Sequence, residues 1–243
     1  FQLGKDNSDY RIIIPIENSL AGRVADIHYL IPKYKLQIHS EHFQKVTHNL
    51  LGIKGSKIKD IKTVRSHAQA LGQAQKFIST NKLISITAAD TAGSAKFISE
   101  NNDKSQGAIA SELAAKIYDL EILKSSVEDE SGNTTRFLIL QKDPTHPELS
   151  DKKYITTCIF QLKSVPASLF KALGSFATNG VNLCKLESFS VKNTFDQVNF
   201  YIDIEGHIEE PALQKALEEL GFHTQKLDVL GVYEAHQFRF KNK

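Results

Sequence analysis

The first half of the chain alternates short apolar runs with segments whose apolar positions recur at helical spacing. The pattern predicts, in order, a strand at 11–16, a helix at 69–78, a strand at 83–87, a helix capped by Asp90 and running through Ile98, a strand at 107–110, and a helix over 112–118 capped by Ser111. Strands that alternate with helices indicate an α/β layer architecture. In such folds ligands bind at the C-terminal ends of the strands.

The second half has a different pattern, which predicts the order βαββαβ. Its predicted elements are a strand at 154–162, a helix from Pro166 through Ala177, a strand at 181–189 after the stop at Asn179-Gly180, a strand at 195–204, a helix from Pro211 to Leu220, and a strand at 226–233. This order is typical of a ferredoxin-like unit of about 80 residues. We expect helices to cover one face of its sheet, and the other face to be available for pairing or ligand binding.

A polar segment separates the two halves. It contains Pro144 and Pro147, and proline interrupts both helices and strands. We therefore predict an α/β domain over 1–143, a linker over 144–152 and a ferredoxin-like domain over 153–243.

Composition removes several classes of function. Lys and Arg total 30 against 28 Asp and Glu, with no basic cluster, so neither nucleic acid nor an anionic membrane surface is an expected partner. No apolar run approaches the roughly 18 to 20 residues of a membrane helix. Cys158 and Cys184 lack the spacing of a metal or redox motif and are expected to be buried, reduced thiols. We expect a soluble, cytoplasmic protein.

Candidate chemistry is concentrated just before the apolar run at 138–140, in Asn133-Thr134-Thr135-Arg136-Phe137. Arginine is rare in this chain, at five residues of the 30 cationic ones. Its planar guanidinium binds a carboxylate through two hydrogen bonds, which the point charge of lysine does not reproduce. The segment therefore indicates an anion site built from hydroxyls and Arg136.

Three other segments of the first half place small polar residues after a strand, at 15–19, 66–70 and 89–95. Helix N-termini at such places bind anions through free backbone N–H groups, although ordinary N-capping uses the same residue types. For each segment alone, capping is the simpler interpretation. Together with the Thr-Thr-Arg segment, they favour a shared pocket for a small, multiply charged acid. The segment 39–42 contains two histidines and a glutamate, but it is predicted to be extended, and we predict no metal site.

These segments, in this order, resemble the prephenate dehydratase family. The resemblance rests on Pro-Ile-Glu-Asn-Ser at 15–19, Ser66-His67 with Gln69-Ala70, Thr91-Ala92, and Asn-x-Thr-Arg-Phe ending at Phe137. It implies a two-lobed catalytic domain like that of periplasmic binding proteins, followed by an ACT regulatory domain. Thr135 and Arg136 would be catalytic, Thr135 assisting departure of the ring hydroxyl and Arg136 neutralising a carboxylate. The substrate-binding residues that the resemblance implies are Asn18, Ser19, Ser66, His67, Gln69, Thr91, Ala92 and Phe137.

The implied reaction converts prephenate to phenylpyruvate with loss of water and carbon dioxide, in L-phenylalanine biosynthesis. Aromatisation of the ring drives it, so positioned hydrogen-bond donors suffice and no cofactor or metal is expected. An unperturbed threonine is a poor acid, so we expect Thr135 to act as a hydrogen-bond donor. Glu17 is a second candidate acid, although a structural hydrogen bond suits its place in the turn better.

The second half resembles the ACT domain that binds L-phenylalanine in these enzymes. The implied effector residues are Ala167, Ser168, Leu169, Asn182, Leu183, Glu187 and Ser188. Ala167 stands where the family often has glycine, and Phe189-Ser190 replaces a common Arg-Pro pair. ACT domains pair side by side, so a homodimer or homotetramer is expected. The alternative is that this domain only dimerises.

The sequence departs from the family at its start, because the usual strand and Gly-Pro-x-Gly-Thr/Ser loop ahead of residue 15 are missing, and it contains no methionine. We expect it to be a fragment of a complete enzyme rather than an inactive homologue. Two alternatives stay open. Arogenate, the amino analogue of prephenate, is a second possible substrate, and a non-catalytic sensor of small acids and amino acids is a second possible class.

Overall fold

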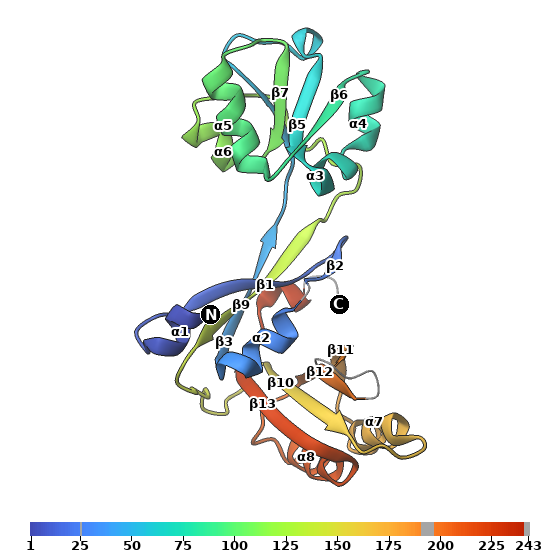
Figure 1. The fold of residues 1–243 in the computed structure, drawn as a ribbon. Helices are drawn as coiled ribbons and strands as arrows, with labels where there is room; N and C mark the ends of the chain where they lie inside the picture. The colour runs from blue at the N-terminus through green and yellow to red at the C-terminus, as the bar shows by residue number, and fades with distance from the viewer. Residues whose placement is uncertain (25, 191–196, 241–243) are drawn as a thin grey trace. The chain divides into compact units, whose positions relative to one another are not determined.

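A computed structural model describes residues 1–24, 26–190 and 197–240, and divides the chain into two compact units (Figure 1). Unit 1 comprises Phe1–Gln44 together with Thr135–Lys243, and unit 2 comprises Lys45–Thr134. The predicted boundary at 144–152 is therefore not where the compact units divide. Residues on both sides of it belong to unit 1, because they share one hydrophobic core.

The first sheet of unit 1 has the strand order β2-β1-β9-β3. Its elements are α1 (Gln2–Asp6), β1 (Ile12–Asn18), β2 (Gly22–Arg23), α2 (Ile27–Tyr34), β3 (Gln37–Lys45) and β9 (Thr134–Gln141). Strands β1 and β9 run antiparallel. The predicted strand at 11–16 and the extended segment at 39–42 are confirmed.

The second sheet of unit 1 is the C-terminal sheet, with the order β11-β12-β10-β13 and antiparallel pairing throughout. Its elements are β10 (Tyr154–Leu162), α7 (Ser168–Thr178), β11 (Leu183–Ser190), β12 (Val198–Glu205), α8 (Pro211–His223) and β13 (Thr224–Glu234), with a 3-10 turn at Gln237–Phe240. The predicted order βαββαβ is confirmed. The predicted start of the fourth element at Phe195 lies outside the described residues.

Both faces of the C-terminal sheet are covered. Cys158 and Phe160 of β10 pack against α7 and α8, which lie together on one face (Figure 1). Ile155 and Ile159 point the other way, into a core shared with β1, β3, β9 and α2. The prediction that this second face is open for pairing or ligand binding is wrong, because the first sheet of the same unit covers it.

Unit 2 is a five-stranded sheet of order β6-β5-β7-β4-β8 with helices on both faces. Its elements are β4 (Asn49–Gly52), a 3-10 turn (Ile58–Asp60), β5 (Thr63–His67), α3 (Ala68–Gly72), α4 (Gln75–Thr80), β6 (Ile84–Ala88), α5 (Thr91–Asn101), β7 (Gln106–Ala110), α6 (Glu112–Ile117) and β8 (Glu121–Lys124). Ile109 faces the core under α3 and α4, while Ala108 and Ala110 face α5 and α6. Strand β5 is parallel to β6 and β7, as alternating strands and helices predict.

The helix predicted over 69–78 is instead two short helices, α3 and α4. Asp129 contacts the chain between these two helices. Its backbone N–H donates to Gln73 O at 2.7 Å, and its side-chain carboxylate accepts from Lys76 N at 3.0 Å. A carbonyl engaged outside the helix no longer supports the next turn. The two predicted caps are confirmed, since Asp90 accepts from Gly93 N and Ser111 accepts from Ala114 N.

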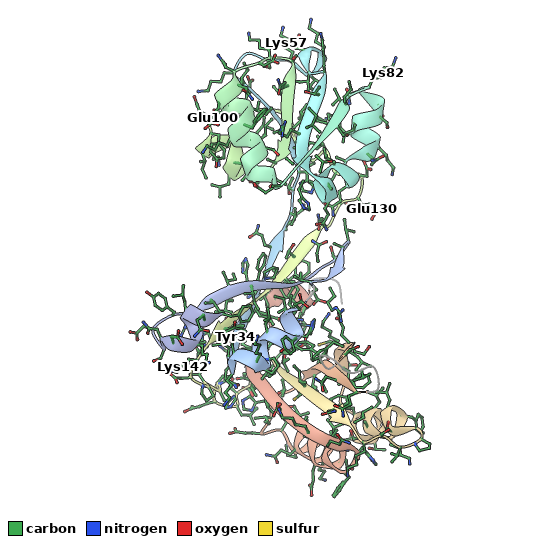
Figure 2. All side chains as sticks on the ribbon, in the orientation of Figure 1. Tyr34, Lys57, Lys82, Glu100, Glu130 and Lys142 are labelled. Atoms are coloured by element: carbon green, nitrogen blue, oxygen red, sulfur yellow. The ribbon has the colours of Figure 1, made fainter. Side chains whose placement is uncertain are left out.

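The surface of unit 2 carries both signs of charge. Lys57, Lys82 and Glu100 are exposed and lie at separate places around the unit (Figure 2). None of the helices in the described ranges combines the length and the apolar character that crossing a membrane requires.

Candidate active site

Two segments far apart in sequence meet where β1 pairs with β9. The register sets Asn18 opposite Thr135 and Glu17 opposite Arg136. Asn18 Nδ2 donates to Thr135 Oγ1 at 3.0 Å, and Asn18 Oδ1 accepts from the N–H groups of Leu20 and Ala21 at 3.0 and 2.9 Å. The Asn18 amide is thus oriented by its own turn. Because the Thr135 oxygen accepts from Asn18, its O–H is directed elsewhere and can serve as a donor.

Arg136 lies on the opposite face of β9 from Thr135. Successive side chains of a strand point to opposite faces, and the burial of β9 alternates accordingly, with Arg136 only 2% exposed. Its guanidinium donates four hydrogen bonds within the protein: to Glu41 at 2.8 Å, Glu17 at 3.0 Å, Asp203 at 2.5 Å and Tyr233 Oη at 3.0 Å.

In this structure the partners of the Arg136 guanidinium are side chains of the protein, and the role that the resemblance implies for it, binding a substrate carboxylate, stays a prediction. The guanidinium does bind carboxylates, as its fork predicts, but they belong to the protein. Its side chain is buried and does not share a face with Thr135. Arg136 connects β9 to β12 and β13 of the C-terminal sheet.

A second arginine completes the charge balance around Glu41. Arg239 Nε donates to Glu41 Oε1 at 2.7 Å and its Nη2 donates to Oε2 at 2.8 Å, which is a bidentate contact. Glu41 also accepts from His236 N at 3.0 Å. Glu41 therefore belongs to this ion-pair network. His39, from the same segment 39–42, lies with its Nδ1 3.2 Å from Thr145 Oγ1. Residues 1–24, 26–190 and 197–240 contain no group of three or more His, Cys, Asp or Glu side chains placed to hold a metal ion.

The network holds two carboxylates, Asp203 and Glu17, charged. Burial alone raises the pKa of Asp203, but the charge of Arg136 and the hydrogen bond from Thr157 outweigh burial and lower that pKa below its ordinary value. For Glu17, burial likewise raises the pKa, while the hydrogen bond from Lys185 and the charge of Arg136 lower it to a greater extent. A carboxylate held ionised is a poor proton donor, so Glu17 fits the structural role better than that of an acid.

In unit 2 the predicted residues gather at the C-terminal ends of β5 and β6. These strands are parallel, with His67 in register with Ala88, so the residues that follow each strand lie at the same edge of the sheet. His67 and Gln69 are exposed there, and Thr91 and Ala92 form the first turn of α5. Ser66 differs: it is fully buried and its hydroxyl donates to Ile109 O at 2.6 Å. Its contribution in this structure is to hold β5 and β7 together.

Sequence reasoning missed Gln73, which links two parts of unit 2. Gln73 Oε1 lies 2.8 Å from His48 Nε2 and accepts from Asn133 Nδ2 at 2.9 Å. Asn133 begins the Asn-x-Thr-Arg-Phe segment, so its amide is tied to the end of α3, the helix that follows Ser66-His67. The signal in the sequence is weak, because a glutamine inside a helical pattern normally indicates only a solvated position.

The predicted effector residues are divided between two places. Ser168 and Leu169 line an open pocket of about 550 Å³ together with Val198 and Phe200 of β12. Ala167 caps α7 with a φ of 58°. The remaining four, Asn182, Leu183, Glu187 and Ser188, lie in or beside β11 and do not line this pocket. Glu187 accepts from Lys185 at 2.5 Å and lies 3.8 Å from His28 Nε2.

The sequence of this chain is similar to those of known proteins. The family model for prephenate dehydratase matches residues 2–145. A bifunctional N-acyl-homoserine lactone acylase/prephenate dehydratase from Komagataeibacter europaeus is 43% identical over 94% of this chain and 82% of its own length. Arogenate dehydratase 2 from Petunia hybrida is 37% identical over 92% of this chain, which spans 60% of that relative.

A solved structure agrees with these sequence matches. Prephenate dehydratase from Arthrobacter aurescens in complex with L-Phe superposes with a TM-score of 0.85 at 26% identity, covering 96% of this chain and 78% of that one. The family model covers more than half of the residues, and its match includes the paired segments of β1 and β9. The chain belongs to the prephenate dehydratase family.

Proposed function

We propose that this chain converts prephenate to phenylpyruvate, water and carbon dioxide. The observation that carries the proposal is the hydrogen bond between Asn18 and Thr135, which joins two segments of the matched family region. In the reaction a C–C bond to the ring carboxylate breaks, its electron pair completes the aromatic ring, and the ring hydroxyl leaves with a proton as water. The chain must orient the substrate and donate a hydrogen bond to the departing hydroxyl.

Thr135 is the proposed donor to that hydroxyl. Asn18 donates to the Thr135 oxygen and so directs the threonine proton away from β1. We expect Thr135→Val, which keeps the size and removes the hydroxyl, to lower kcat by about 100-fold with KM within twofold, because the lost contact strengthens as the hydroxyl departs. Thr135→Ser keeps a hydroxyl and should retain most activity. A Thr135→Val enzyme with near-normal kcat would remove Thr135 from the mechanism.

We propose substrate-binding roles for the exposed polar residues that follow β5 and β6, namely His67, Gln69 and Thr91, with Ala92 offering its backbone N–H at the start of α5. Ser19 and Phe137 of unit 1 are assigned the same role by the family resemblance. Ser66 belongs to this set only by position, because its hydroxyl already donates to Ile109 O. Because Thr91 is proposed to bind the substrate, Thr91→Val should raise KM more than it lowers kcat.

We further propose that L-phenylalanine binds the C-terminal half, interpreted as an ACT domain, and inhibits the reaction. The pocket beside Ser168 and Leu169 is of suitable size for an amino acid, and the structure from Arthrobacter aurescens is described as a complex with L-Phe. Leu169→Trp should fill the pocket and abolish inhibition while leaving kcat intact. Absence of any phenylalanine effect on wild-type activity or melting temperature would support a domain that only dimerises.

The decisive experiment mixes purified protein with prephenate and follows phenylpyruvate, with and without L-phenylalanine. Arogenate is tested in parallel, because relatives named arogenate dehydratase match most of this chain. Binding of prephenate without turnover would favour the sensor instead. Size-exclusion chromatography with light scattering tests the proposed homodimer or homotetramer, and cell fractionation tests the proposed cytoplasmic location.

A second activity is worth assaying on one specific ground. The relative from Komagataeibacter europaeus carries a combined acylase and dehydratase name and aligns with 94% of this chain. We propose testing release of the acyl chain from N-acyl-homoserine lactones by the same preparation. Activity that survives Thr135→Val would indicate a separate set of catalytic groups.

A further inference from the structure

Charged side chains of the C-terminal sheet form ion pairs with the two strands that carry Asn18 and Thr135. We call the four residues involved the charge clamp: Glu17 of β1, Arg136 of β9, Lys185 of β11 and Asp203 of β12. Arg136 Nη1 donates to Glu17 Oε1 at 3.0 Å and to Asp203 Oδ2 at 2.5 Å. Lys185 Nζ contacts the other Glu17 oxygen, Oε2. Each oxygen of Glu17 thus receives its own cation.

The charge clamp lies one residue from the proposed donor. Glu17 is in register with Arg136, and the next pair along the two strands is Asn18 with Thr135. The register shifts between Pro15 and Glu17, which marks a β-bulge. A bulge leaves one residue unpaired and disrupts the ladder locally. The hydrogen bond from Arg136 to Glu17 joins the two strands beside this irregularity, at the position next to Asn18 and Thr135.

Lys185 is the member of the charge clamp that β11 contributes. Its side chain is 9% exposed, and both of its acidic partners are close, with Glu187 at 2.5 Å. Burying an ammonium costs several kcal/mol unless its partners compensate. The contact of Lys185 with Glu17 supplies part of that compensation and connects β11 to β1.

We propose that Lys185 is a positioning residue for the dehydration: through Glu17 it holds β1 in the register that lets Asn18 orient the hydroxyl of Thr135. This inference rests on the function proposed above. It makes turnover depend on β11, the strand that also carries the predicted effector residues Glu187 and Ser188.

The test compares Lys185→Met with Lys226→Met. Lys226 lies on β13 of the same sheet and pairs with Asp228 at the surface, so the control removes the same charge from an exposed ion pair. We expect Lys185→Met to lower kcat about tenfold with KM within twofold, because a small displacement of the donor affects the transition state more than binding. Lys185→Arg keeps the positive charge and should retain most of the wild-type kcat. Normal kcat in Lys185→Met would overturn the proposal.

A double variant separates positioning from folding. Lys185→Met alone leaves Glu17 short of one partner, whereas Lys185→Met with Glu17→Gln removes both charges together and should fold even where the single variant does not. If Lys185 acts through Glu17, the double variant has the same kcat as Glu17→Gln alone. Additive losses would show that Lys185 acts by another route, and the proposal would fall.

Hydrogen exchange gives a readout that does not depend on activity. Amides of residues 12–18 and 134–141 should exchange several-fold faster in Lys185→Met than in wild type, and at the wild-type rate in Lys226→Met. If wild-type protein does not turn over prephenate, the proposed function fails by itself, and faster exchange in Lys185→Met still supports the clamp's hold on β1 and β9. Unchanged exchange overturns the clamp whether or not the enzyme is active.

Discussion

At the scale of single residues, Thr135 and Arg136 show how adjacent positions serve different purposes. Thr135 faces away from the C-terminal sheet and takes its hydrogen bond from Asn18, whereas Arg136 is buried among three carboxylates and Tyr233. Removing one partner from such a network leaves an uncompensated buried charge, at a cost of about 3 to 5 kcal/mol. Lysine keeps the charge but lacks the planar fork that reaches these partners together, so Arg136→Lys should lower the urea midpoint of unfolding although the net charge is unchanged.

Ala167 gives the first stability prediction. It adopts a φ of 58°, a left-handed conformation that costs a residue with a Cβ roughly 1 to 2 kcal/mol. Ala167→Gly should raise the free energy of unfolding by up to about 1 kcal/mol, after the added flexibility of the unfolded chain is counted. Ala172→Gly, inside α7 and fully buried, should lower it. Chemical denaturation of the two variants distinguishes them, and equal losses would contradict the backbone argument.

His28 gives a pH prediction. Burial lowers the pKa of His28 from 6.5 to about 4, against the opposing charge of Glu187. The unfolded chain therefore binds a proton below pH 6.5 while the folded chain does not, so stability falls between pH 6.5 and about 4, by as much as about 3 kcal/mol. His28→Phe should flatten this part of the stability curve, and His146→Gln, at an exposed position, is the control. A curve of wild-type shape in His28→Phe would disprove the assignment.

At the scale of elements, β13 approaches β3 so closely that only glycine fits at Gly231. A Cβ built there would press on Ile38 O and lie 2.9 Å from Ile38 Cβ. Backbone atoms yield little, so Gly231→Ala should force the two strands apart and lower the free energy of unfolding by about 1 to 3 kcal/mol.

The matched control for that prediction is Gly174→Ala. Gly174 lies in α7, and a Cβ built there would meet open space, so alanine there should stabilise the helix by up to about 1 kcal/mol. Thermal melts of the pair should move in opposite directions. A Gly231→Ala protein as stable as wild type would show that the sheets separate without cost.

Elements also show what the sequence could and could not predict. Strands β1, β6, β7 and β10 and the caps at Asp90 and Ser111 were predictable, because periodicity and capping are local signals. The break between α3 and α4 was not, since it arises from Asp129, more than fifty residues along the chain. For Arg136 the sequence indicated a carboxylate partner on the substrate, and its carboxylate partners within the protein were not predicted. Which carboxylates it binds depends on Glu41 and Asp203, and no local pattern connects these residues.

At the scale of the whole molecule, the carboxylates of unit 1 predict a second acid transition. The ordinary pKa values of Glu17 and Asp203 are 4.5 and 3.8, and both are lowered in the folded state. Their contribution to stability is fully present above those ordinary values and is lost as pH falls through the lowered ones. In Glu17→Gln the free energy of unfolding should therefore fall less steeply below about pH 4 than in wild type. The change between pH 6.5 and 4 that is attributed to His28 should persist. Urea titrations at closely spaced pH values measure both.

Unit 1 is formed by two stretches of sequence that flank unit 2, and this order affects how the chain folds during its synthesis. Residues 45–134 form a unit with its own hydrophobic clusters, whereas the core of unit 1 combines Ile16 and Ile38 with Leu230 and Tyr233. On the ribosome, β1 and β3 emerge long before β9 and the C-terminal sheet that cover them. Unit 2 can fold as soon as it emerges, while the core of unit 1 must wait for β12 and β13. Strands β1 and β3 therefore stay exposed until those strands emerge, and chaperones can bind them in that interval.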